Sequence, residues 1–228
     1  MQEYPPAYPV FSGSRTGMPA TSPAFSTRAG VGGGGGASQL SMSTVGAGIP
    51  EPPREEPNSA WLTDAELDWV RGRIPLLYVE AVPVRVDGLG VVTQVGVLLR
   101  ANAQGEITRT LVSGRVMYGE TIRDALFRHL EKDLGPMAFP QLPASPVPFQ
   151  VAEYFPIPGL SAYVDERQHA VSLAFVVPVT GTFEPRQDAL ELTWVTPAEA
   201  SSPAFHAELE GGRGTLVRAA LASVGVLG

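Results

Sequence analysis

Ionisable side chains of different chemistry fall within one short stretch of the chain, at Glu120, Arg128, His129, Lys132 and Asp133. On a helix, residues three and four positions apart share a face, so His129, Lys132 and Asp133 would project together. An imidazole and a carboxylate at this spacing could hold a divalent cation, or could hydrogen-bond to each other. The ammonium of Lys132 could contact a phosphate directly or be solvated. This stretch is the first candidate for a functional site.

The same stretch has the sequence pattern of a helix that could position these groups. Apolar residues recur every four positions and would form one buried stripe, which consists of Ile122, Leu126, Leu130 and Leu134. A glycine and a proline follow at 135 and 136, where glycine suits the end of a helix and proline prevents its continuation. We therefore predict a helix over 120–134.

The charged residues around this helix each have a functional and a structural interpretation. Glu120 could bind a metal, or cap the helix and interact with the positive N-terminal end of its dipole. Arg128 could serve in catalysis, or pair with Asp124 four residues earlier. Arg109 and Arg115 border the loop before the helix and could hold a diphosphate or form structural ion pairs. The sequence leaves both interpretations open for each residue.

The segments around this helix predict a sheet with a few further helices. Thr63 and Glu66 have the spacing of a capping box, which predicts a short helix at the start of the fold. Apolar and β-branched runs, bounded by turn residues, predict strands. The predicted strands are 76–86, 91–99, 107–112, 149–155, 170–179 and 190–195, with a proline-rich connection over 140–148 and later helices from Thr196-Pro197 and over 216–224. This order predicts an α+β fold with a mixed β-sheet and helices on its faces.

The first 58 residues differ in composition from the rest of the chain. They contain nine prolines and ten glycines and show no sustained helical or strand period. Such a segment cannot bury enough apolar surface to offset the entropy of ordering it. We therefore predict a disordered N-terminal tail over 1–58 and a folded domain over 59–228.

Composition and charge exclude several classes of function. The net charge is −7, with no basic stripe, which disfavours nucleic acid as a partner. The chain has no cysteine, so disulfides, thiolate metal sites and cysteine nucleophiles are excluded. There is no apolar run of about 18 residues, and the first residues lack the basic start and apolar run of a signal peptide. We therefore expect a cytoplasmic protein with no nucleic-acid or membrane partner.

Read from Gly114, the central stretch resembles the Nudix box, G-x5-E-x7-R-E-U-x-E-E-x-G-U, where U is a bulky apolar residue. Glu120, Arg128, Leu130 and Gly135 fall at the matching positions. The resemblance covers roughly residues 76–228. More narrowly, the chain is similar to an uncharacterised family of Nudix-like proteins. It implies a Nudix-type α/β/α sandwich. Because many Nudix proteins are dimers, it also allows a homodimer.

The resemblance implies a metal site on one helix face. In an active box, three glutamates hold Mg²⁺ or Mn²⁺ against the diphosphate of the substrate. Here those positions are His129, Lys132 and Asp133, so the box is degenerate on that face. Lys132, the only lysine of the chain, would repel a divalent cation by on the order of a few kcal/mol at a partly buried site. The box alone therefore disfavours ordinary Mg²⁺-dependent hydrolysis.

The roles that the resemblance implies can still be assigned residue by residue. Catalysis would fall to Arg128, His129 and Asp133, and metal binding to Glu120 and Asp133. Substrate binding would fall to Arg109, Arg115 and Lys132. Some Nudix enzymes take a further carboxylate from a later loop, where Glu184 and Asp188 are candidates, and His169 could line the cleft.

Three hypotheses for function follow from these observations. The first is a hydrolase of a nucleoside diphosphate linked to another moiety, which would use Mg²⁺ or Mn²⁺. The second is a catalytically silent Nudix domain, without a cofactor, that binds a nucleotide-like small molecule or a protein. The third is a scaffold or dimerisation module.

Overall fold

The computed structural model describes residues 61–101, 105–185 and 189–226, so the tail predicted over 1–58 lies outside the described residues. The helices are α1 (Asp64–Arg71), α2 (Ile122–Leu134), α3 (Pro197–Ala200), α4 (Pro203–Glu208) and α5 (Arg213–Ser223), with a 3-10 turn, η1 (Glu210–Gly212). The strands are β1 (Leu76–Val86), β2 (Val92–Ala101), β3 (Ile107–Thr110), β4 (Val112–Arg115), β5 (Ala138–Pro140), β6 (Gln150–Phe155), β7 (Tyr163–Val164), β8 (Ala170–Gly181) and β9 (Ala189–Val195).

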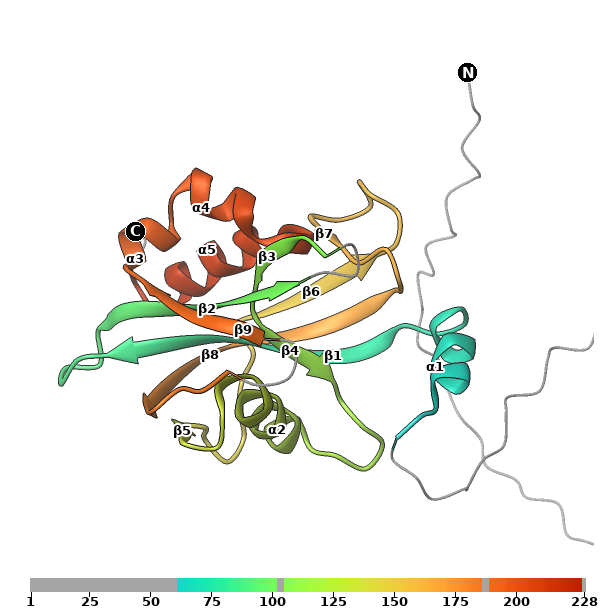
Figure 1. Ribbon diagram of the computed structural model, residues 1–228, viewed down its shortest axis with the longest axis horizontal. Helices are drawn as coiled ribbons and strands as arrows, with labels where there is room; N and C mark the ends of the chain where they lie inside the picture. The colour runs from blue at the N-terminus through green and yellow to red at the C-terminus, as the bar shows by residue number, and fades with distance from the viewer. Residues whose placement is uncertain (1–60, 102–104, 186–188, 227–228) are drawn as a thin grey trace, which may run out of the picture. The chain divides into compact units, whose positions relative to one another are not determined.

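The strands of the described residues form a mixed sheet around β1 (Figure 1). Strand β1 pairs in parallel with β8, from Leu76 opposite Ala170 to Val84 opposite Pro178. It pairs antiparallel with β2 and with β4. The path of neighbouring strands is β3-β2-β1-β8-β6-β7, with β9 paired to β2 and β5 to β8. The predicted α+β fold with a mixed sheet is confirmed.

Helices cover both faces of this sheet, and each face has its own apolar core (Figure 1). Figure 1 shows α2 on one face and α3, α4 and α5 on the other. Strand β1 serves both cores, because neighbouring side chains on a strand point to opposite faces. Ala81 packs in the core on the α2 side, and Val82 packs in the core on the α5 side. This is the α/β/α sandwich that the Nudix resemblance implied.

The helices begin and end where their capping residues lie. Thr63 and Glu66 form the predicted capping box of α1. The hydroxyl of Thr121 accepts a hydrogen bond from the backbone N–H of Asp124, so α2 begins at Ile122, two residues later than predicted. Gly135 ends α2 with a φ of 95°, a backbone conformation that favours glycine. In the described part of the chain, no helix is long and apolar enough to span a membrane.

Two sequence predictions about strands were wrong. The single strand predicted over 107–112 is two strands, because the chain leaves β2 at Thr110 and pairs with β1 from Val112. The connection predicted over 140–148 starts inside a strand, since β5 ends at Pro140 and is held by β8. In both places tertiary pairing, which local sequence does not encode, decided the structure.

Candidate functional site at the Nudix-like box

The loop between β4 and α2 is folded around one carboxylate, that of Glu120. Arg128 donates two hydrogen bonds to it, from Nε to Oε1 and from Nη2 to Oε2, both 2.7 Å long. The backbone N–H of Met117 donates a third, at 3.0 Å. The hydrogen bond from Arg128 is the main cause of the lowered pKa of Glu120, which therefore stays ionised. Arg128 pairs with Glu120 rather than with Asp124, and the pair closes the loop onto the helix.

His129 lies against Gly114 at the first position of the box. A Cβ at residue 114 would collide with the imidazole ring, so this glycine is required by close approach. Nε2 lies 3.0 Å from the carbonyl oxygen of Arg115, which can only accept a hydrogen bond, so Nε2 carries the proton. Burial lowers the pKa of His129, whose exposed fraction is 6%. The imidazole is therefore neutral at pH 7.

Asp133 lies under the same helix face and is held by two cations. Its side chain is 1% exposed, and Oδ1 accepts a 2.6 Å hydrogen bond from Nη2 of Arg100 in β2. The ammonium of Lys132 lies 3.2 Å from the same oxygen. No sequence pattern pointed to Arg100, which is separated from Asp133 by 33 residues. Its one signal was an arginine after the apolar run Val97, Leu98 and Leu99.

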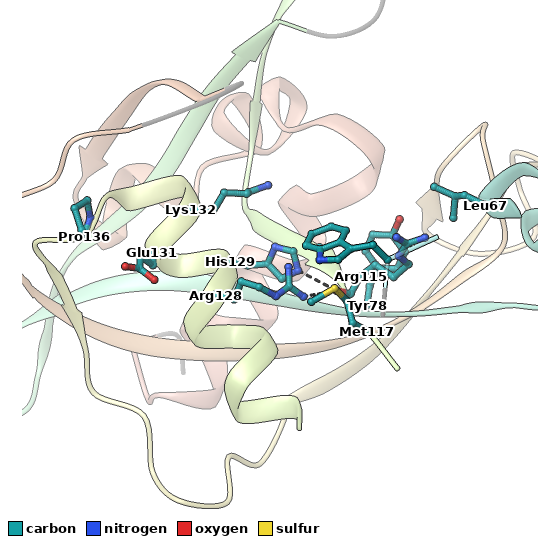
Figure 2. Close-up of a pocket in the computed structure, with 11 residues that line it drawn as sticks. Leu67, Tyr78, Arg115, Met117, Arg128, His129, Glu131, Lys132 and Pro136 are labelled. Carbon is teal, nitrogen blue, oxygen red and sulfur yellow. Dashed lines mark hydrogen bonds between the residues drawn. The ribbon is translucent and has the colours of Figure 1, made fainter. Parts of the chain in front are cut away.

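A pocket of about 650 Å³ opens beside this helix face (Figure 2). Figure 2 shows Arg128, His129 and Lys132 on α2, with Leu67 of α1 across from them. The full lining is Trp61, Leu67, Tyr78, Gly114, Arg115, Met117, Arg128, His129, Glu131, Lys132 and Pro136. The pocket thus combines aromatic and apolar surface with three permanent cations and one carboxylate.

The structure gathers some of the predicted site residues here and places others elsewhere. Arg115, Arg128, His129 and Lys132 line the pocket, and Asp133 lies behind Lys132. Arg109 does not line it: Nε donates to Glu208 at 2.7 Å, and the guanidinium lies over the ring of Phe205.

The candidates from later segments do not line the pocket either. The backbone N–H of Glu184 donates to the carbonyl of Leu134, and the imidazole of His169 stacks on Phe155. Neither residue belongs to the pocket lining. Asp188 lies outside the described residues.

The arrangement of the box carboxylates does not fit a divalent metal. Glu120 is enclosed by Arg128 and a backbone N–H, and Asp133 by Arg100 and Lys132. A hard cation needs several converging oxygen ligands with negative charge to spare. In the described residues, no group of three or more histidines and acidic residues is placed to hold a metal ion.

Comparisons with known proteins agree with this architecture. A family model described as domain of unknown function (DUF4916) matches residues 57–226. No curated protein matches the chain. A solved protein from Jonesia denitrificans, named as a possible asymmetric diadenosine tetraphosphate (Ap4A) hydrolase, is 60% identical in sequence with a TM-score of 0.66. That match covers 68% of this chain and 98% of the Jonesia protein.

More distant structures carry the Nudix name. A NUDIX hydrolase from Nitrosomonas europaea is 13% identical, with a TM-score of 0.49, over 66% of this chain and 90% of that one. The NUDIX domain of Shewanella oneidensis NrtR, solved with ADP ribose, is 14% identical, with a TM-score of 0.46, over 67% and 90% of the two chains. At that distance they say nothing more about this chain. The family match over 57–226 shows that the chain belongs to the family described as domain of unknown function DUF4916, and within that family it carries a Nudix-like box on a Nudix-type sandwich.

Proposed function

We propose that this Nudix-like domain binds a nucleotide-like small molecule, with a phosphate group and a base, in the pocket beside α2. The observation that carries the proposal is the pocket lining, which brings cations and aromatic rings of distant segments together at the box. Ligand pockets are typically apolar with a few placed polar groups, and this lining has that composition.

The phosphate would contact Arg115 and Lys132. Arg128 also lines the pocket, but its Nε and Nη2 are already committed, to Glu120 and to the carbonyl of Arg115. Nη1 of Arg115 is buried and has no hydrogen-bond partner among the described residues. An unpaired buried donor costs free energy that an anionic ligand would recover. Lys132 is 26% exposed in the same lining and can reach solvent or ligand.

The base would lie on the aromatic part of the lining. Trp61 is 61% exposed, and the guanidinium of Arg128 lies 5.7 Å from the centroid of its ring, so an aromatic ring stands beside a cation at the pocket. Tyr78 also lines the pocket, and its hydroxyl accepts a 2.8 Å hydrogen bond from Gln168, which holds the side chain in place. Stacking of a base on an aromatic side chain contributes about 1–3 kcal/mol.

Hydrolysis of a nucleoside diphosphate linked to another moiety is the second candidate function. It is favoured by the 60% identical Jonesia protein, which is named as a possible Ap4A hydrolase. In that case Arg128, His129 and Asp133 would act in catalysis with Mg²⁺ or Mn²⁺ as cofactor. The ion pairs of Glu120 and Asp133 weigh against this candidate, so it ranks below binding.

Ligand binding can be tested with a panel of Ap4A, ADP ribose, ATP and inorganic pyrophosphate. We expect at least one nucleotide to raise the melting temperature and to quench the fluorescence of Trp61, compared with a Trp61→Phe variant. Arg115→Gln should weaken this binding about tenfold, because one charge-assisted contact is lost. Arg109→Gln is the matched control, since Arg109 lies outside the pocket lining, and it should bind like the native chain.

Two outcomes would decide against binding at this pocket. Silence of the whole panel in both readouts would rule out the proposed function, and equal loss in the two arginine variants would place the ligand elsewhere. Hydrolysis is followed in the same samples by chromatography of the products. Metal-dependent product release would move the second candidate to first place.

A further inference from the structure

The helix face that carries metal-binding glutamates in an active Nudix box is occupied in this chain by an ion cluster. Its members are Arg100 of β2, and Lys132 and Asp133 of α2, and we name it the Arg100 cluster. Both cations approach the same oxygen, Oδ1 of Asp133, at 2.6 Å from Arg100 and 3.2 Å from Lys132. Two permanent positive charges and one negative charge leave the cluster with a net positive charge.

The two cations of the cluster have different surroundings. Lys132 belongs to the pocket lining, whereas Arg100 does not, and Asp133 is buried at 1% exposure. Arg100 therefore holds Asp133 from the sheet side, and Lys132 presents the charge of the cluster to the pocket. A buried carboxylate needs such partners, because an isolated buried charge is strongly unfavourable.

The other ionisable groups at this face do not offset the positive charge. His129 is neutral, because burial lowers its pKa, and its Nε2 is bound to the carbonyl of Arg115. The charge of Glu120 is paired with that of Arg128. Glu131 is the one carboxylate in the pocket lining, and its single negative charge is outnumbered by the positive charges of Arg115 and Lys132 in the same lining.

We propose that the Arg100 cluster takes the place of the metal: the domain binds phosphate through Lys132 without a divalent cation, and Arg100 keeps the box from recruiting one. The inference has two halves: phosphate binding by Lys132 without a cation is the ligand half, and exclusion of a cation by Arg100 is the metal half. The ligand half rests on the proposed function, whereas the metal half does not depend on it. Like charges a few ångströms apart repel, and the effect is strong away from bulk water. A fixed ammonium supplies positive charge to an anion at all times, while a metal must first be bound.

Arg100 opposes a metal at this face in addition to the loss of the glutamates. If the missing glutamates were the whole cause, His129→Glu, Lys132→Glu and Asp133→Glu together would create a metal site. The carboxylate at 133 would still be neutralised by Arg100, whose Nη2 lies 2.6 Å from Oδ1 in the native chain. Oδ2 of Asp133 is buried without a partner among the described residues, so removal of Arg100 from the triple variant, which already lacks Lys132, would leave the whole carboxylate at 133 available.

The metal half is tested by titrating Mn²⁺ into the full-length chain and following free Mn²⁺ by electron paramagnetic resonance. We expect no specific binding to the native protein and little to the triple glutamate variant. Adding Arg100→Leu to that variant should strengthen Mn²⁺ binding at least about tenfold, because one opposing charge is removed. Specific Mn²⁺ binding by the native chain, or equal binding by the two multiple variants, would overturn the inference.

The multiple variants could fail to fold, and circular dichroism will show whether they do. In that case the native chain and Lys132→Gln decide the metal half, since Lys132 is partly exposed and its replacement leaves Arg100 on Asp133. Neither protein should bind Mn²⁺ specifically. Binding by Lys132→Gln at an affinity typical of a metalloenzyme would show that Arg100 does not exclude the metal.

The ligand half is tested with pyrophosphate and ADP ribose, in the presence of a chelator and then of excess Mg²⁺. We expect affinities that agree within about twofold, and a loss of about tenfold in Lys132→Gln under both conditions. Arg109→Gln, outside the pocket, should match the native chain. Binding only with Mg²⁺ would overturn this inference and leave the proposed function standing. Binding under neither condition would rule out both the proposed function and the ligand half of the inference. The Mn²⁺ titration would still decide the metal half.

Discussion

The contact between Gly114 and His129 shows how a box position keeps its residue type when its chemistry has changed. The imidazole ring occupies the space that a Cβ at residue 114 would need. The ring is fixed in turn by its hydrogen bond to the carbonyl of Arg115, the residue that follows the glycine. The glycine is therefore needed here to accommodate a neutral side chain of the helix, and that need can be tested.

Gly114→Ala should destabilise the domain by about 1–3 kcal/mol, which is typical of overpacking a buried position. The free energy of unfolding is measured by urea denaturation. His129→Ala removes the colliding ring, so the double variant Gly114→Ala/His129→Ala should be more stable than the sum of the two single effects predicts. Strict additivity would show that the ring is not what excludes a side chain at 114.

At the residue scale, sequence predicted the box framework and missed its partners. The register that resembles a Nudix box singled out Glu120 and Arg128, which bind each other, and Leu130, which is buried, because these residues lie within one loop and one helix. It could not show that Arg128 binds Glu120 rather than Asp124, since both carboxylates are near in sequence. Arg100 was beyond reach, because its contact with Asp133 depends on how the sheet packs against α2.

Helix α1 is tied to the rest of the domain by a polar contact. It contributes no buried residue, although Leu67 lies in the pocket lining. Arg71 links it to the turn before β8, by a 3.0 Å hydrogen bond from Nε to the buried side chain of Gln168. Gln168 in turn donates to the hydroxyl of Tyr78, so the link ends at a pocket residue.

We expect Arg71→Gln to loosen α1 without unfolding the domain. Amide hydrogen exchange over 64–71 should become faster, while exchange over 122–134 stays at the native rate. Arg73→Gln is the matched control, because Arg73 contacts Trp69 of its own segment instead of the sheet. Faster exchange in the control as well, or unchanged exchange in Arg71→Gln, would show that this link does not hold α1.

At the element scale, sequence predicted elements with local signals and failed where pairing decides. The capping box at Thr63 and the apolar stripe of α2 are local patterns, and both helices are present. The run 107–112 is divided between two partner strands, β2 and β1, and nothing in its own residues marks the division. Pairing of this kind is set by the neighbouring strands.

For the whole domain, one buried ion pair joins the centre of the sheet to the last helix. Glu80 of β1 is 1% exposed, and its Oε1 accepts a 2.6 Å hydrogen bond from Nε of Arg213 in α5. The hydroxyl of Tyr154 also donates to the carboxylate, at 2.8 and 3.0 Å. The pair connects residues 133 positions apart, on the face of the sheet opposite α2. No spacing rule could have revealed it.

Replacing one partner of this pair should lower the free energy of unfolding more than replacing both. Arg213→Met leaves the carboxylate of Glu80 buried without its cation, and we expect a destabilisation of about 3–5 kcal/mol by urea denaturation. Glu80→Leu leaves a buried guanidinium and should cost a similar amount. The double variant leaves no buried charge and should be more stable than either single variant, because apolar replacement of a whole buried pair is often tolerated.

The same variants separate stability from binding, because neither Glu80 nor Arg213 lines the pocket. Below the melting temperature of each variant, the folded Arg213→Met protein should bind the panel ligands with native affinity. A loss of affinity in Arg213→Met comparable to that in Arg115→Gln would mean that the Glu80–Arg213 pair is coupled to the pocket. Native affinity together with reduced stability would assign the Glu80–Arg213 pair to the fold and leave ligand binding to the side chains of the box.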